Sequence, residues 1–478
     1  MKGTKLFLLL GSISKEELSS LRKAVLSPSF NTNPSVVKLF DTLRKQYPHF
    51  DTSPRGKRKL YAKLFPKENY SDGKLRRLFT FLAQVVEKYL ILQKISENSN
   101  THSNVLRKVY QERNLTSLFE AETNKELKRI EAQAVKGVDG YESEFNCLMM
   151  KYANLHHPKY DQKDDTLYRA EQNLDQYFLL QKLRIAIGKK SREKILKISS
   201  NEAILGMPKL PDGVDNPLLE LYYQSYFLLT EEQEVNFIDY EQKLKENIHI
   251  FPVYDRLLLF YNGLNYLVRL LNRGKKMEEG AVIRWYKWGL SEKYLIQHNR
   301  LSTITFGNIV YQGCKAQEFE WVNEFIQTYS IYLKDEFKQD EIAYSRLVLT
   351  FSQKRFKEVI FGLTAYQFSD HYILKTKNLK ARTYFELFLL DNDYFDLLSH
   401  SLKSYENYLY RNKDFSKEHI QHHIYFVHVV KGLMRKYTKH KAQGHIQSWL
   451  KEQLISKPTM VSKKWLIDKF LLKNASPI

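Results

Sequence analysis

The 478-residue chain has little cysteine, glycine or proline, and each shortage excludes a class of protein. It contains two cysteines, 18 glycines and 12 prolines. Two distant cysteines cannot build a disulfide framework or a zinc knuckle. The scarcity of glycine and proline disfavours folds that need many tight turns, such as β-sandwiches and glycine-rich nucleotide-binding folds. We therefore expect an all-α protein in which Cys147 and Cys314 are buried thiols in a reducing compartment.

Long hydrophobic runs are also absent. The apolar run from Leu6 to Leu10 is shorter than the apolar core of a signal peptide. Ser14 followed three residues later by Glu17 is typical of a helix start. No stretch approaches the roughly 18 apolar residues that span a bilayer. We therefore predict a short packed helix at Leu6 to Leu10, a cytoplasmic location and no membrane contact.

The motifs of common enzyme families are missing as well. The chain has no GxxxxGK[ST], GxGxxG, HExxH, GxSxG or CxxC motif. Their absence argues against P-loop enzymes and zinc proteases, and less strongly against enzymes in general. We expect no enzymatic activity, no catalytic residue, no cofactor and no metal.

Histidine is concentrated near the C-terminus, where seven of the 14 histidines fall between residues 400 and 445. His419 and His423 would share one face of a helix at a spacing of four residues. Such a pair can chelate zinc or nickel, but no third ligand follows at a fixed spacing. The favoured interpretation is a polar helix face that gains positive charge below about pH 6.5. Metal binding by the pair stays open.

Positive charge is in excess at the two ends of the chain. The net charge is +21, from 75 basic and 54 acidic residues. Residues 1–100 hold 19 basic and 8 acidic residues, a charge of +11, and residues 431–478 hold 11 and 2, a charge of +9. The long middle, 101–430, is nearly neutral at +1, with 45 and 44. This distribution suggests one or two surfaces that face a polyanion.

The densest basic cluster lies between residues 55 and 77. A helix is expected to begin after Ser71, and cations in its first turn oppose the helix dipole. A bound phosphate would relieve that conflict and accept hydrogen bonds from the free amides. A solvated basic surface is the alternative interpretation. The candidate polyanion-binding residues are Arg55, Lys57, Arg58, Lys59, Lys74, Arg76 and Arg77.

Prolines and polar stretches divide the chain into five segments. Within the first segment, prolines separate helices that we predict at about 15–26, 34–46, 56–65 and 71–94. The predicted segments are a basic helical N-terminal domain at 1–95, a linker at 96–104, a helical middle region at 105–204, helical repeats at 217–440 and a basic helical tail at 441–478.

An internal period is present beyond residue 217. Apolar residues that would begin the second helix of each pair recur at separations of 45, 37, 37 and 39 residues; they are Phe237, Val282, Phe319, Phe356 and Phe395. Residues three positions further on are apolar in all five cases, which completes one helical stripe. A helix pair of this length cannot bury its apolar face alone, so it is the unit of an α-solenoid.

This part of the chain resembles a degenerate tetratricopeptide array. The resemblance covers about residues 220–440. It rests on the length of the helix pair and on the aromatic residue that begins the second helix at Phe319, Phe356 and Phe395. The family's Trp-x2-Leu-Gly-x2-Tyr start and its closing proline are not visible. The N-terminal stretch from Leu26 to Asn31 is similar to uncharacterised helical proteins of bacteria, which implies no activity.

Two functional hypotheses follow from these patterns. The resemblance implies a non-enzymatic scaffold that binds protein partners, which is the usual role of helical-repeat arrays. The alternative is a nucleic-acid-associated protein whose basic N- and C-terminal helices hold the phosphate backbone without strong sequence recognition.

Overall fold

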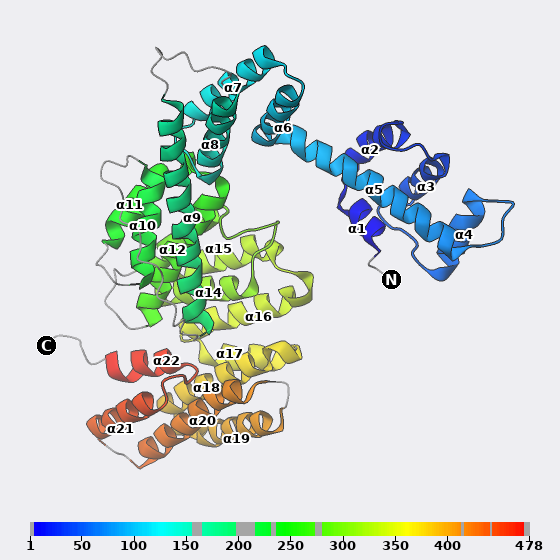
Figure 1. The fold of residues 1–478 in the computed structure, drawn as a ribbon. Coiled ribbons are helices and arrows are strands. Elements are labelled where there is room, and N and C mark those ends of the chain that lie inside the picture. Colours follow the sequence, from blue (N-terminus) through cyan, green and yellow to red (C-terminus); the bar gives the residue numbers. More distant parts are fainter. Residues whose placement is uncertain are drawn as a thin grey trace. The chain divides into compact units, whose positions relative to one another are not determined.

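The computed structural model is all-α, which confirms the predicted fold class. It describes residues 4–154, 165–196, 216–230, 236–272, 280–412, 415–439 and 442–472. These residues form 22 α-helices and no β-strand. The chain divides into two compact units, Met1–Pro252 and Val253–Ile478, and Figure 1 labels their helices along the chain.

The first unit contains the helices up to α11. They are α1 (Lys5–Ser12), α2 (Glu17–Leu26), α3 (Pro34–Arg44), α4 (Pro54–Leu64), α5 (Asp72–Glu97), α6 (Ser99–Glu112), α7 (Thr116–Glu131), α8 (Val138–Ala153), α9 (Thr166–Leu196), α10 (Pro217–Thr230), α11 (Phe237–Asn247) and the 3₁₀ turn η1 (Ile248–Ile250).

Helices α1 to α5 share one hydrophobic core. Leu6 and Leu10 of α1 are each 1% exposed and belong to this core. The Ser14 amide donates to Oε2 of Glu17 at 2.7 Å, and the Glu17 amide donates to Oγ of Ser14 at 3.2 Å. This reciprocal pair confirms the predicted helix start, because it satisfies two amides that the first turn leaves free.

The structure corrects the linker predicted at 96–104. Helix α5 continues to Glu97 and α6 begins at Ser99, so a single residue, Asn98, separates them. The Asn98 side chain accepts a hydrogen bond from the Thr101 amide at 3.0 Å and caps α6. The polar residues that suggested a linker form the cap and first turns of a helix that packs on α7, in part through Asn100 and Ser103 themselves. The break predicted between 205 and 217 lies almost wholly outside the described residues.

The second unit contains the helices from α12 onward. They are α12 (Val253–Asn272), α13 (Ala281–Ser291), α14 (Thr303–Lys315), α15 (Phe319–Tyr329), η2 (Ser330–Tyr332), α16 (Asp335–Ser352), α17 (Phe356–Ala365), η3 (Asp370–Tyr372), α18 (Ile373–Leu390), η4 (Asn392–Tyr394), α19 (Phe395–Arg411), α20 (Lys417–Thr438), α21 (Gln443–Ser456), α22 (Lys463–Ile467) and the π-helical turn η5 (Asp468–Leu472).

The second helices of the predicted pairs begin where the period places them. Helices α11, α15, α17 and α19 start at the predicted residue, and α13 starts one residue earlier. The stripe residues three positions on are at most 1% exposed; they are Tyr240, Trp285, Val322, Val359 and Leu398. The sequence period therefore corresponds to a buried position on each of these helices.

One turn geometry recurs at three helix connections, between α6 and α7, between α14 and α15, and between α16 and α17. A residue with left-handed backbone ends the first helix, and the next residue donates its amide to the carbonyl five positions back. The left-handed residues are Asn114 (φ 56°), Gln317 (φ 59°) and Lys354 (φ 62°). The amide-to-carbonyl distances are 2.9, 3.0 and 3.1 Å. This is a common way to end a helix and reverse the chain, and two of the three turns are 37 residues apart.

The first helices of the pairs in the second unit form a layer of their own. Helix α14 packs on both α15 and α16, and α16 packs on both α17 and α18. Helix α18 packs on α19 and meets α20 through the rings of Phe385 and Tyr437, whose centroids are 6.4 Å apart. We call α14, α16, α18 and α20 the first-helix layer (Figure 1). Such alternating contacts are what stacked helix hairpins produce.

The predicted C-terminal tail packs on these helices. Ile446 and Leu450 of α21, Leu466 of α22 and Phe470 of η5 belong to the same hydrophobic core as α18, α19 and α20. In Figure 1 the helices α18 to α21 lie side by side, in orange to red.

Candidate functional site

Helix α18 carries a polar stripe within the first-helix layer. Lys375, Asn378, Arg382 and Glu386 follow one another at spacings of three and four residues, so they share one helix face. Much of the rest of α18 is apolar and buried, with Phe385 at 0% exposure. Polar side chains on the face of an otherwise buried helix need partners, and these partners reveal what the surface can bind.

At its N-terminal end the stripe meets a buried carboxylate. Glu341 of α16 is 0% exposed, and its Oε2 accepts a hydrogen bond from the Tyr372 hydroxyl at 2.5 Å. Nζ of Lys375 lies 3.5 Å from the same oxygen. Burial, reinforced by the hydrogen bond to Glu341, raises the pKa of Tyr372 well above its usual range. The phenol therefore stays a donor, and the carboxylate is matched by one cation.

The middle of the stripe holds two buried donors that are incompletely satisfied. Nδ2 of Asn378 and Nε of Arg382 make no hydrogen bond of ordinary geometry among the described residues, although the two side chains interact with the hydroxyls of Tyr405 and Tyr344. The Arg382 guanidinium lies 5.0 Å from the centroid of the Phe351 ring. A buried donor without an acceptor costs about 1–3 kcal/mol. A carbonyl or carboxylate oxygen brought to this position would recover part of that cost.

At its C-terminal end the stripe binds the chain's own C-terminal segment, residues 462–472. Glu386 accepts a hydrogen bond from Nε1 of Trp465 at 3.1 Å and pairs with Nζ of Lys469 at 2.5 Å. The Ser462 hydroxyl donates to Oδ1 of Asn378 at 2.8 Å. The stripe can therefore hold a peptide through an indole, an ammonium group and a hydroxyl.

Comparison with models of protein families, with curated proteins and with solved structures finds no match to this chain. The tetratricopeptide resemblance therefore stays a prediction. The functional argument depends on the geometry of the chain itself.

The seven predicted polyanion-binding residues occupy three different environments. Lys57 is only 7% exposed. Lys74 pairs with Glu68 and Arg76 pairs with Asp72, each at 2.7 Å. The other four are exposed and have no carboxylate oxygen within 4.0 Å among the described residues; they are Arg55, Arg58, Lys59 and Arg77.

The N-termini of both basic helices are occupied by the chain's own carboxylates. Asp51 lies against the first turn of α4, where a Cβ added to Gly56 would meet its Cγ at 2.3 Å. Hydrogen bonds from Ser53, with the nearby charges of Lys59 and Arg55, hold the pKa of Asp51 below its usual range. Asp72 serves the same purpose in the first turn of α5. These carboxylates relieve the dipole conflict that suggested a bound phosphate.

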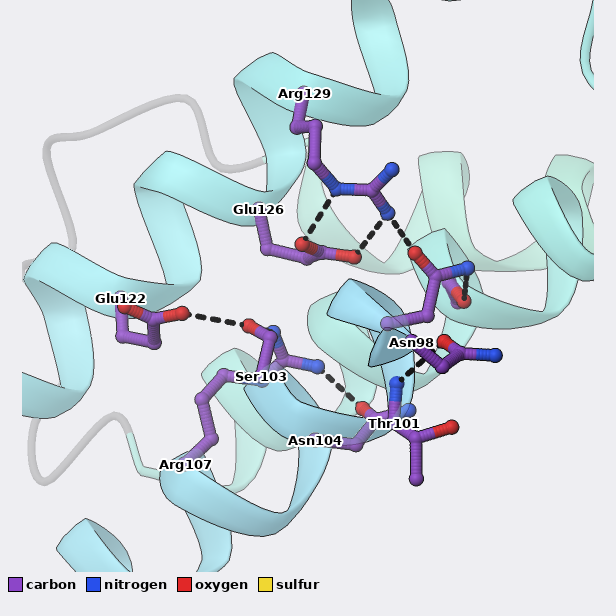
Figure 2. A network of polar contacts seen from close by, with 10 residues as sticks. Asn98, Thr101, Ser103, Asn104, Arg107, Glu122, Glu126 and Arg129 are labelled. Atoms are coloured by element: carbon purple, nitrogen blue, oxygen red, sulfur yellow. Dashed lines mark hydrogen bonds and ion pairs between the residues drawn. The ribbon is translucent and has the colours of Figure 1, made fainter. Parts of the chain in front are cut away.

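A buried polar network joins α6 to α7 (Figure 2). Arg107 is 0% exposed and donates to Oγ of Ser103 at 2.9 Å, and the Ser103 hydroxyl donates to Oε1 of Glu122 at 2.9 Å. Arg129 donates to both carboxylate oxygens of Glu126, at 2.9 and 2.6 Å. Each carboxylate drawn in Figure 2 is matched by a donor, which fits a clasp between two helices.

A cavity of about 380 Å³ opens beside this network. Asn100 lines it and also bridges the clasp, because it accepts from Arg129 and donates to Oγ of Ser143 at 3.1 Å. The only charged side chain in the lining is that of Asp139. A single carboxylate offers no partner for general acid–base catalysis.

The histidine cluster differs from its predicted role. The rings of His419 and His423 lie on one face of α20 with centroids 4.9 Å apart. His423 is buried against the Tyr405 hydroxyl. Burial, with the charges of His419 and His422, lowers the pKa of His423 to about 4. This ring therefore stays neutral where the sequence suggested a gain of charge, because the sequence did not reveal its burial.

The part of the chain that the structure describes holds no cluster of metal-ligating side chains, and both of its thiols are buried. Within the described ranges, no group of three or more His, Cys, Asp or Glu side chains is arranged to hold a metal ion. Cys147 and Cys314 are buried free thiols, as predicted. Burial raises the pKa of each to about 11, so neither is a thiolate at neutral pH. No described helix has the length and apolarity needed to cross a bilayer.

Sequence reasoning missed the α18 stripe and its contacts with the C-terminal segment. The available signal was the spacing Lys-x2-Asn-x3-Arg-x3-Glu from Lys375 to Glu386, within a helix that also carries apolar residues. That spacing places the four side chains on one face. It does not reveal that the face lies within a layer of stacked helices.

Proposed function

We propose that the protein is a non-enzymatic scaffold that binds a segment of a partner protein on the first-helix layer of its second unit. The supporting observation is the stacking of successive hairpins, in which α14 packs on α16 and α16 packs on α18. Stacked hairpins build an extended surface from the side chains of successive helices. That surface is the usual binding site of helical-repeat proteins, and the turns repeated at 37 residues agree with it.

The chemistry of the stripe favours a peptide as the ligand. Lys375 and Arg382 supply positive charge, Glu386 supplies negative charge, and Asn378 supplies an amide. A surface of mixed sign matches the alternating donors, acceptors and charges of a polypeptide. A polyanion would be repelled by Glu386. It would also leave Trp465 and Lys469, the two residues now bound to Glu386, without a partner.

Exposed side chains on α14 extend the same surface. Ile304, Tyr311 and Lys315 are spaced seven and four residues apart, so they share one face of α14. Ile304 is 75% exposed and Tyr311 is 39% exposed. Exposed aliphatic and aromatic side chains near a polar stripe are typical anchors for a partner protein.

The test compares two matched variants of the tagged full chain. The first, Ile304→Asp with Tyr311→Ala, changes the first-helix layer. The second, Leu397→Asp with Tyr410→Ala, changes exposed residues of α19 outside that layer, where exposure is 49% and 66%. Proteins captured from the source cells are quantified for both variants and for the parent, and thermal unfolding checks that all three are folded.

We expect at least one captured protein to be retained by the parent and the α19 variant and lost by the α14 variant. Loss of about tenfold or more would correspond to removal of a central anchor. Equal recovery by the two variants, or no protein recovered above the tag alone, would contradict the scaffold function.

Binding of nucleic-acid phosphate is a second candidate function. It is favoured by Arg55, Arg58, Lys59 and Arg77, which are exposed and have no carboxylate within 4.0 Å among the described residues. The test measures affinity for duplex DNA as a function of salt, with these four residues changed to Glu. Each lost phosphate contact should reduce the slope of log affinity against log salt by about 0.9. An unchanged slope and affinity would exclude this function.

A further inference from the structure

The C-terminal segment, residues 462–472, lies on the first-helix layer in the manner of a bound peptide. Its Trp465 ring packs edge-on against Phe385 of α18, with centroids 5.9 Å apart. Phe470 packs against the same Phe385 at 6.0 Å and against Tyr437 of α20 at 6.1 Å. Between these two rings, Lys469 reaches Glu386. Two aromatic anchors, one lysine and the Ser462 hydroxyl, which donates to Oδ1 of Asn378, therefore contact α18.

We propose that this segment is an intramolecular ligand that masks the α18 and α20 part of the partner-binding surface. The partner then presents a short helix of the same chemistry, with two aromatic side chains and a lysine that reaches Glu386. Partner binding requires the segment to leave. This inference rests on the proposed scaffold function and names the class of ligand that the scaffold accepts.

The form of the segment suits detachment. Helix α22 has five residues and η5 adds a five-residue π-helical turn, so the segment makes few backbone hydrogen bonds of its own. Ser462, which precedes α22, has left-handed backbone (φ 55°) and provides no side-chain cap. A segment with so little intrinsic stability remains helical only through its tertiary contacts, and it can open without unfolding the layer beneath it.

The C-terminal segment makes one attractive and one repulsive charge contact with the first-helix layer. Glu386 attracts Lys469, whereas Lys464 faces Lys315 of α14, a like charge. Burial and Lys315 together lower the pKa of Lys464 to about 8, and Asp468 offsets part of this effect. Near neutral pH one ion pair holds the segment and one like-charge contact opposes it. The charges therefore add little net stabilisation to the apolar contacts of Trp465, Leu466 and Phe470.

The first experiment is hydrogen exchange of the full chain, read on the peptides that cover residues 463–472. We expect these amides to exchange through local opening, faster than those of α18 and α20. Glu386→Gln should increase their exchange about tenfold, because it weakens one charged hydrogen bond and one ion pair. Lys464→Met should decrease it, because it removes the like-charge contact. Glu324→Gln, at an exposed position of α15, is the matched control.

The alternative is that the segment is a permanent part of the core, since Leu466 is 0% exposed. In that case residues 463–472 would exchange only together with α18 and α20. Neither Glu386→Gln nor Lys464→Met would then change their exchange selectively. That result would overturn the proposal.

The second experiment uses a fluorescent peptide of residues 460–472 as the ligand. The full chain with Trp465→Ala and Lys469→Glu, whose own segment is weakened, should bind the peptide about tenfold more tightly than the parent does. Adding Glu386→Lys to that chain should abolish binding, and a peptide carrying Lys469→Glu should restore it. Equal binding by the parent and the weakened chain, or no binding by either, would refute intramolecular masking.

The two proposals can fail separately. The peptide experiment involves only this chain and its own segment, so its outcome is independent of any cellular partner. The capture experiment changes α14 residues outside the contacts with Glu386. A positive capture result with a negative peptide result would retain the scaffold and reject the intramolecular ligand.

Discussion

Acidification should destabilise the second unit through His423. The ring is 7% exposed, hydrogen-bonded to Tyr405 and packed edge-to-face against His419. Its pKa is lowered to about 4 from a usual value of 6.5. Between these values the unfolded chain binds a proton that the folded chain does not, so stability falls as pH falls from about 6.5 to about 4.

The expected loss follows from the size of this shift. A pH of about 5 lies about 1.5 units below the usual pKa of histidine. At that pH, protonation of His423 in the unfolded chain lowers the free energy of the unfolded state by about 2 kcal/mol. The full shift corresponds to about 3 kcal/mol. All five tryptophans of the chain lie between residues 285 and 465. Urea unfolding followed by tryptophan fluorescence therefore reports on the second unit.

The assay compares the parent with His423→Gln at about pH 7.5 and about pH 5. Between these two pH values the free energy of unfolding of the parent should fall by about 2 kcal/mol more than that of the variant. The reason is that the variant has no proton to bind at position 423. His445→Gln, at an exposed position of α21, is the control and should follow the parent. Parallel losses in the parent and His423→Gln would refute the assignment of a buried neutral ring.

Three further predictions concern packing and charge. Val322→Ala should lower the free energy of unfolding of the second unit by about 2 kcal/mol, whereas Ile331→Ala, at an exposed position, should change it by less than about 0.5, both by urea unfolding; equal effects would contradict the buried stripe. Gln317→Gly should raise the free energy of unfolding of the second unit by about 1 kcal/mol, because glycine adopts the left-handed backbone conformation without the strain of a Cβ atom. A lower free energy of unfolding would contradict the left-handed geometry of this turn. Glu144→Gln should lower the thermal stability of the first unit by about 2 kcal/mol, measured by calorimetry, since Lys136 and Arg169 lose their shared carboxylate; no change would show that this pairing is unimportant.

The helix pairs were predictable because their signal is local and periodic. Phe319, Phe356 and Phe395 begin α15, α17 and α19, and the residues three positions on are buried in each case. A helix with one apolar face must bury it, so the stripe indicates both the helix and its contact face. The polar run at 99–104 misled the same reasoning, because the capping residue Asn98 and the first turn of a helix are also polar.

The candidate site was less predictable because it depends on contacts between distant residues. Counting charges identified Lys57, Lys74 and Arg76, but it did not reveal that the first is buried and that the other two are paired. The contact between Glu386 and Lys469 spans 83 residues. No periodicity in the sequence reports such a contact, since it is created by the packing of η5 on α18.

The most direct test of the central claim is photo-crosslinking from single positions of the full chain. A photoreactive phenylalanine analogue replaces Tyr311 on α14 or, as the control, Tyr410 on α19. The account predicts that position 311 forms a covalent adduct with a partner protein and that position 410 does not. Adducts from position 410 alone, or equal adducts from both, would contradict binding on the first-helix layer.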